Sequence, residues 1–324
     1  MEPYAVYELE PGELVRAGPR SKHRPPQVFV AYRFSSARSK AFRDRLSGEL
    51  GRLQGLGDIV LVDGKVLPSV SWSTEIRRRI TQSKFVIADL TGLSPEVLFE
   101  CGFAWGLGQV ILPVVSSPDW IRRLPRWLTS IQVGQFETAE GWREIIDSIA
   151  DILSEGPASA VKRTTPDPVP GRVLLLKPRE GEGRLEEEID YLSSRFELSQ
   201  PEGEILGETI EDAGEDLIEE VCRASLLVGG LSGTGEDSFV HFATGVVASR
   251  PTAGVARRKL FRRVLLVAES TQRARELSAD SARRATNTVR LSSTSGVREE
   301  VGRFGENYRR WVRDNRSRPG GFSD

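Results

Sequence analysis

Residues 84–115 constrain the fold more than any other stretch of the 324-residue chain. They contain two short apolar runs, joined by a helix-length segment that begins at Ser94-Pro95. Asp89 closes the first run, and Glu100 falls in the second turn of the expected helix. Because the runs show almost no polar alternation, they predict strands buried on both faces, as in a parallel sheet covered by helices.

The flanking segments continue this alternation of strand and helix. The expected strands are residues 28–31, 59–62, 84–89, 110–115 and 131–136. A helix is expected over residues 73–82, with Ile76 and Ile80 directed inward and the three arginines 77–79 on a solvated face. Five strands connected by helices predict a flavodoxin-like, doubly wound α/β domain.

The second half of the chain resembles the first at a constant spacing. Residues 224–233 lie 141 positions after residues 83–92, and the two segments align without a gap. Expected strands at 264–267 and 288–291, and a helix over 297–311, complete the second pattern. An internal repeat of this length predicts two tandem copies of one domain, each with a five-stranded parallel sheet flanked by helices.

The two copies differ at their acidic positions. Asp89 pairs with Gly230, and Glu100 pairs with His241. If the first copy is catalytic, the second has lost both carboxylates and is expected to be a degenerate copy with a structural or regulatory role.

These patterns divide the chain into five segments. The segment before the second copy is Pro-rich and lacks apolar periodicity, which is typical of a linker. The predicted segments are a flexible N-terminal arm (1–25), a first domain (26–154), a linker (155–171), the second copy (172–314) and a C-terminal tail (315–324).

Composition limits the classes of partner and site. With 45 basic and 46 acidic residues the net charge is −1, which supplies no overall attraction to nucleic acid or to an anionic membrane. Two cysteines, Cys101 and Cys222, and two histidines, His23 and His241, form no disulfide framework and no metal-ligand spacing. No stretch approaches the roughly 18 consecutive apolar residues of a membrane-spanning helix, and the first residues lack the basic and then apolar pattern of a signal peptide. A cytoplasmic protein without a membrane partner is therefore expected.

The candidate site lies beyond the carboxyl ends of the strands, where doubly wound sheets bind ligands. Aromatic side chains there suit stacking on a base, an arginine suits a phosphate, and carboxylates suit a sugar or its reaction. The predicted catalytic residues are Glu100 and Asp89. The predicted substrate-binding residues are Tyr32, Arg33, Phe34, Trp72, Glu75, Thr91, Gly92 and Glu96.

Glu100 carries most of the chemical argument. It stands among apolar residues on a helix expected to be buried, where a glutamate requires a specific reason. Glu96 and Glu100 occupy the first two turns of that helix, whose N-terminus favours negative charge. An ionised carboxylate beside a sugar C1′ can stabilise an oxocarbenium-like transition state or attack the carbon covalently.

The sequence from Asp89 to Leu112, D-L-T-G-L-S-P-E-V-L-F-E-C-G-F-A-W-G-L-G-Q-V-I-L, resembles a family motif. The family is that of nucleoside 2-deoxyribosyltransferase-like proteins and the related TIR-like domains of bacteria. V-F-V-A-Y-R-F, residues 28–34, resembles their first strand and base-binding turn, and the likeness extends over about residues 26–154.

The resemblance implies roles for both carboxylates. In the transferases the matching glutamate is the nucleophile at C1′, which carries over to Glu100, and the matching aspartate assists in the sugar site, which carries over to Asp89. Catalytic TIR domains use a comparable glutamate to cleave the nicotinamide–ribose bond of NAD. No cofactor is implied, and NAD is a candidate substrate. The sequence departs from the family motif at several positions, among them Ser94, Glu96 and Cys101. Because the glutamate is retained, these departures bear on which substrate is bound and not on the chemistry.

Two functional interpretations follow. The first is an enzyme that cleaves or transfers an N-glycosidic bond in a nucleoside, nucleotide or NAD-like molecule. The second is a non-catalytic TIR-like nucleotide-sensing or signalling module, as in bacterial defence, in which the paired domains form one interface. Apart from both functions, the purely structural alternatives are that Glu100 pairs with an arginine at a domain interface and that Asp89 caps the following turn. For both functions the expected partner is a small nucleoside or nucleotide. The resemblance to the family also implies that the chain forms a homo-oligomer.

Overall fold

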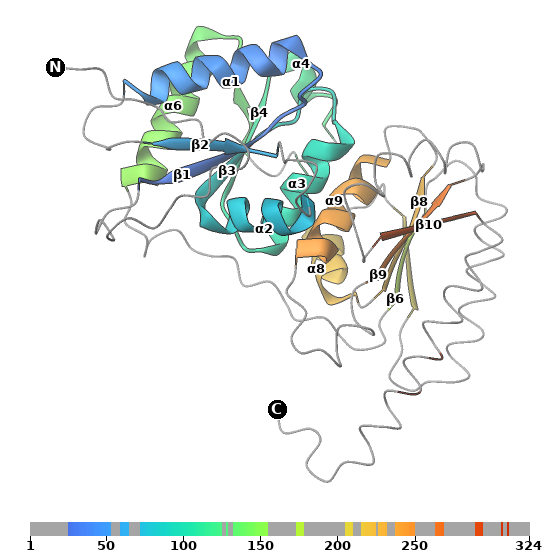
Figure 1. The fold of residues 1–324 in the computed structure, drawn as a ribbon. Coiled ribbons are helices and arrows are strands. Elements are labelled where there is room, and N and C mark those ends of the chain that lie inside the picture. Colours follow the sequence, from blue (N-terminus) through green and yellow to red (C-terminus); the bar gives the residue numbers. More distant parts are fainter. Residues whose placement is uncertain are drawn as a thin grey trace, which may run out of the picture. The chain divides into compact units, whose positions relative to one another are not determined.

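A computed structural model describes the chain in two compact units, Met1–Thr165 and Pro166–Asp324 (Figure 1). The described residues are 25–52, 59–64, 72–124, 128, 132–154, 173–177, 205–209, 215–224, 226–231, 237–249, 263–268, 289–293, 306 and 310. The predicted arm (up to residue 24), linker and tail lie outside them, as does most of the helix expected over 297–311.

The first unit contains a five-stranded sheet in the order β2-β1-β3-β4-β5. Its strands are β1 Gln27–Ala31, β2 Val60–Asp63, β3 Ser83–Asp89, β4 Ile111–Val115 and β5 Gly134–Gln135. All neighbouring strands pair in parallel, which confirms the α/β class and the parallel sheet. The fifth strand is shorter than expected. Strand order reverses between β1 and β3, and this is the point where such sheets bind ligands.

Helices cover both faces of this sheet. They are α1 Ala37–Leu50, α2 Trp72–Gln82, α3 Pro95–Gly106, the short α4 Pro118–Ile121 and α6 Ala139–Ser154. Figure 1 shows α1 and α6 on one face and α2 and α3 on the other. Helix α3 begins at Pro95, as the sequence predicts, because proline suits the first helical position and Ser94 precedes it.

The core under α1 and α6 is built from alternate residues of the central strands. Phe85 and Ile87 of β3 join Phe42 of α1 and Trp142 of α6 in one buried cluster. The ring of Phe42 lies 4.5 Å from the ring of Phe136 and 6.0 Å from that of Trp142, between centroids. Because side chains alternate between the two faces of a strand, every second residue of β3, counted from Phe85 and Ile87, points toward α1 and α6.

The arginine run of α2 differs from the prediction. Arg78 is exposed, but Arg79 is only 9% exposed, so the expectation of a solvated face is wrong for Arg79. A helix places residues three apart on nearby faces, and Ile76, three positions before Arg79, is buried. Its charge is retained inside because it has polar partners, which are described below.

The second unit also contains a parallel five-stranded sheet, in the order β10-β9-β8-β6-β7. Its strands are β6 Val173–Lys177, β7 Ile205–Thr209, β8 Leu226–Leu231, β9 Arg263–Ala268 and β10 Val289–Ser293. Helices α8 Glu215–Arg223 and α9 Asp237–Ser249 pack against each other, and α9 lies on β8 and β9 (Figure 1). In the described parts of both units, no helix has the length and apolar character needed to cross a bilayer.

Truncation of Phe42 tests the α1–α6 core. Phe42→Ala removes a ring that is 3% exposed and leaves a cavity, so the unfolding free energy of the first unit should fall by about 3–5 kcal/mol. Urea denaturation of the full chain, followed by tryptophan fluorescence, measures this loss.

Phe34→Ala is the matched control, because Phe34 is 47% exposed and packs edge-on against a single ring. Its loss should stay within about 1.5 kcal/mol, the range of one aromatic pair. Equal losses in the two variants would contradict the assignment of Phe42 to the core.

Candidate active site

Three strands bring their polar ends to one edge of the first sheet. Val30 of β1 is in register with Asp63, which ends β2, and Ala31 is in register with Ala88, which precedes Asp89 in β3. Tyr32 follows β1 directly. Tyr32 and Asp89 of the predicted site therefore lie at the expected edge, next to Asp63.

Asp89 is almost completely buried on the α1 side of this edge. It follows Ile87 by two positions, so its side chain points to the same face, and it is 1% exposed. Its Oδ1 accepts a hydrogen bond from the Thr91 backbone N–H at 3.0 Å, whereas Oδ2 has no hydrogen-bond partner. Burial raises the pKa of Asp89, although the hydroxyl groups of Thr91 and Ser39 and the charge of Arg38 oppose the rise.

The turn after Asp89 is held in a conformation that requires left-handed backbone. Gly92 has φ 78° and Leu93 has φ 47°, and the Leu93 N–H donates to the Leu90 carbonyl at 3.1 Å. Thr91 Oγ1 accepts a hydrogen bond from the Ser116 N–H at 2.9 Å. Thr91 thus connects the end of β3 to the end of β4, and glycine is favoured at position 92 because its φ is positive.

Glu96 lies at the start of α3. The Ser94 side chain makes no capping bond to the helix and instead donates a hydrogen bond to Glu96 Oε2. Glu96 is half-buried and occupies the first turn, where a negative charge is favourable. Glu96, which the sequence predicts to bind substrate, is therefore also part of the N-terminus of α3.

Glu100 is buried on the opposite side of the edge. It is 3% exposed, and its carboxyl group lies against the backbone of Gly64, just after β2. An ideal Cβ built on Gly64 would lie 2.0 Å from Glu100 Oε1 and 3.0 Å from its Cδ. The neighbouring Cys101 responds to the same surroundings, since burial and then the charge of Glu100 raise the pKa of its thiol to about 12.

The two carboxyl groups therefore border the same edge from different faces of the sheet. Asp89 lies on the face covered by α1, while α3 carries Glu100 on the face that it shares with α2 (Figure 1). Both groups are almost completely buried at this end of the sheet. This arrangement differs from a carboxylate pair on a single face.

The turn after β1 holds the aromatic candidates. The Tyr32 hydroxyl donates to Asp63 Oδ2 at 3.3 Å, and burial followed by the charge of Asp63 raises the pKa of Tyr32. The ring of Phe34 stands edge-on to that of Tyr32, with centroids 4.8 Å apart, and Phe34 is largely exposed. Arg33 Nε donates to Ser35 Oγ at 3.0 Å. The side chain of Trp72 lies outside the described residues.

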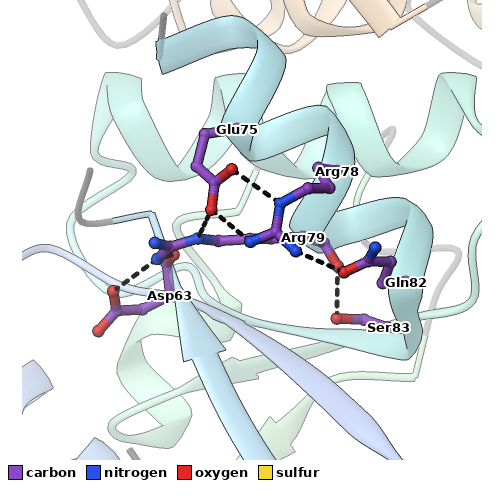
Figure 2. A network of polar contacts seen from close by, with 6 residues as sticks. All are labelled: Asp63, Glu75, Arg78, Arg79, Gln82 and Ser83. Carbon is purple, nitrogen blue, oxygen red and sulfur yellow. Dashed lines mark hydrogen bonds and ion pairs between the residues drawn. The ribbon is translucent and has the colours of Figure 1, made fainter. Parts of the chain in front are cut away.

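Glu75 is bound to two arginines of its own helix (Figure 2). Arg78 donates to both of its carboxyl oxygens, at 2.8 and 2.6 Å, and Arg79 Nε donates to Oε1 at 2.8 Å. The hydrogen bond from Arg78 is the main cause that lowers the pKa of Glu75 to about 2, with Arg79 adding to it against the effect of burial. Glu75 is thus an ionised member of an arginine network.

Three further residues belong to the site but were not predicted from the sequence. Asp63 binds Tyr32, Gly64 contacts Glu100, and Arg79 binds the Asp63 backbone. Asp63 and Gly64 directly follow the strand expected over 59–62, so the rule that sites form at carboxyl ends could have identified them. Arg79 gave no such signal, because the two arginines before it suggested a solvated face.

Comparison with protein-family models, with curated proteins and with solved structures found no match. Within the described residues, no group of three or more His, Cys, Asp or Glu side chains is arranged to hold a metal ion. The family assignment stays a prediction that depends on the motif residues 89–112 and on the first strand and turn.

The raised pKa of Asp89 predicts a specific pH dependence of stability. The folded chain holds this proton more tightly than the unfolded chain, so the unfolding free energy falls as pH rises from the ordinary value of 3.8 through the folded pKa. Asp89→Asn removes this loss. The stability of the variant minus that of the wild type should therefore rise with pH, by at most about 1.4 kcal/mol per unit.

Urea unfolding of both proteins between acidic and neutral pH measures this difference. Asp119→Asn, at an exposed position of α4, is the control and should give a difference that changes little with pH. A stability difference for Asp89→Asn that stays constant or falls with pH would contradict the burial argument.

A methyl group at position 64 should move the Glu100 carboxyl group. Because the methyl group would meet the flexible end of the Glu100 side chain, Gly64→Ala should fold, with a stability loss of about 1–3 kcal/mol. A crystal structure should show the Glu100 carboxyl displaced by about 1 Å or more, to reach normal contact distance.

Gly48→Ala is the control, since an ideal Cβ there meets nothing within 4 Å. It lies in α1 and should gain up to about 1 kcal/mol from the higher helix propensity of alanine. An unmoved Glu100 in Gly64→Ala would show that the contact does not define its place.

Proposed function

We propose that the first unit cleaves or transfers an N-glycosidic bond in a nucleoside, nucleotide or NAD-like substrate. The observation that supports this most is Glu100, a carboxyl group 3% exposed at the ligand-binding edge of a doubly wound sheet. Buried carboxylates are costly, so one in an apolar helix at this edge is best explained by use. The motif that includes it favours chemistry at a ribosyl C1′.

The reaction would proceed at the bond between C1′ and the base nitrogen. The Glu100 carboxylate would stabilise the positive charge on C1′ as the bond breaks, or attack C1′ to form a covalent intermediate that water or a second base then resolves. Asp89 would hold the sugar from the other face. Phe34, with Tyr32 behind it, would stack on the base, and Trp72 is the remaining aromatic candidate.

The second unit would be a degenerate copy of this domain. Its strand order, read from β7 to β10, repeats the order β2-β1-β3-β4-β5 when strands are numbered within each unit. Gly230 in β8 and His241 in α9 take the positions of Asp89 and Glu100. Without either carboxylate this unit would serve a structural or regulatory role in a tandem flavodoxin-like, TIR- or deoxyribosyltransferase-like protein.

A second candidate function is nucleotide sensing without catalysis. The near-complete burial of both Asp89 and Glu100 suits this function as well, because a carboxyl group that only helps to hold a binding site does not have to reach a reacting carbon. In this case a small nucleoside or nucleotide would bind at the same edge and promote assembly, for example into a homo-oligomer.

The first test is release of free base from a panel of nucleosides, nucleotides and NAD. Glu100→Gln keeps the size of the side chain but not its charge, so it should fold and reduce base release by at least about 100-fold. Chromatography of the reaction products measures the release, and a thermal melt checks the fold.

Glu144→Gln, at an exposed position of α6, is the matched control and should retain full activity. Unchanged release in Glu100→Gln would refute the proposed mechanism. Ligand-dependent assembly of the wild type, with no base released from any compound, would instead support the sensing function.

A further inference from the structure

Arg79 is a buried guanidinium group with defined partners on two elements (Figure 2). Its side chain is 10% exposed, and Nη1 donates a hydrogen bond to the Asp63 backbone carbonyl at 2.7 Å. Nε donates to Glu75 Oε1 at 2.8 Å, and Nη1 lies 3.9 Å from Asp63 Oδ1. An ion in such a place is retained only if its partners replace water.

The partner that matters is the backbone of Asp63. This residue ends β2, and the next residue, Gly64, is the one whose backbone meets the Glu100 carboxyl group. The hydrogen bond of Arg79 therefore fixes the peptide at the surface on which Glu100 rests. The absence of a side chain at Gly64 provides the space for Oε1.

We propose that Arg79 is a positioning residue for Glu100, acting through the Asp63–Gly64 backbone. The inference rests on the proposed function of Glu100 in glycosidic-bond chemistry. Arg79 holds the end of β2 in place, and Gly64 then sets where the carboxyl group can lie. Glu75 has a supporting part, because its ionised carboxylate orients the guanidinium group from within the same helix.

Arg78 shows what a purely structural arginine does in this helix. It also binds Glu75, and Nη1 donates to Gln82 at 2.7 Å, but its partners all lie in α2 and its side chain is 50% exposed. Of these two arginines, Arg79 is the one with a hydrogen bond to the end of β2, at the Asp63 carbonyl. The two neighbours therefore separate helix stability from positioning of the site.

The experiment compares Arg79→Met, Arg79→Lys and the control Arg78→Met in the full chain. Kinetics use the compound of the panel that releases most base. Arg79→Met should lower kcat by about 10- to 100-fold, as expected for a misplaced reacting group, and leave KM within about twofold. Arg79→Lys, which keeps the charge and one hydrogen bond, should recover part of kcat. Arg78→Met leaves the hydrogen bonds of Arg79 to Glu75 and to the Asp63 backbone in place, so its kcat should stay within about twofold of the wild type.

Crystal structures of the same variants supply a readout that does not depend on activity. The Glu100 carboxyl group should be displaced in Arg79→Met and unmoved in Arg78→Met, and thermal melts identify any variant that fails to fold. If Arg79→Met does not fold, Arg79→Lys carries the test, with a smaller loss of kcat and a smaller displacement.

The possible failures are distinguishable. A wild type that releases no base refutes the proposed function, while a displaced Glu100 in the Arg79 variants still supports positioning. An unmoved Glu100 in folded Arg79 variants, or an equal loss of kcat in Arg78→Met, overturns the positioning role even if Glu100→Gln is inactive.

Discussion

The contact between the Glu100 carboxyl group and the Gly64 backbone joins α3 to the end of β2. Removing a carboxylate from water costs several kcal/mol unless the protein replaces the lost hydration. The absence of a side chain at Gly64 leaves the space that the Glu100 carboxyl group occupies, in the second turn of α3. The local geometry of α3, β2 and the arginine network of α2 can all be understood as support for that contact.

Two carboxyl groups of the first unit, those of Asp89 and Glu75, have pKa values shifted in opposite directions. Burial raises the pKa of Asp89. In contrast, hydrogen bonds from Arg78 and Arg79 lower the pKa of Glu75, in helix α2, and keep it ionised. Groups whose surroundings push their pKa values apart are a recognised feature of functional sites. Because Asp89 and Glu100 approach from opposite faces, a sugar held between them would be contacted on two sides, which suits a reaction at one face of C1′.

The strands and the buried helix were predictable because their apolar runs are short, unbroken and bounded by turn residues. The places of Asp89 at the end of a strand and of Glu100 in the buried helix were predictable for the same reason, since an acidic residue stands out in an apolar run. Gly64 and Arg79 were not, because their roles depend on contacts between segments separated in sequence. Arg79 in particular follows two arginines, and local pattern cannot show which of three adjacent charges turns inward.

The second unit separates the needs of the sheet from the needs of the site. Its described strands form the same strand order in parallel, although the predicted alignment of the two halves pairs Gly230 and His241 with Asp89 and Glu100. His241 is half-buried between Val240 and Phe242, which are both buried, so a helix at this place packs without a carboxylate. The carboxylates are therefore not required to build this kind of sheet. Their burial in the first unit needs another reason, and the proposed binding or chemistry at the edge would supply one.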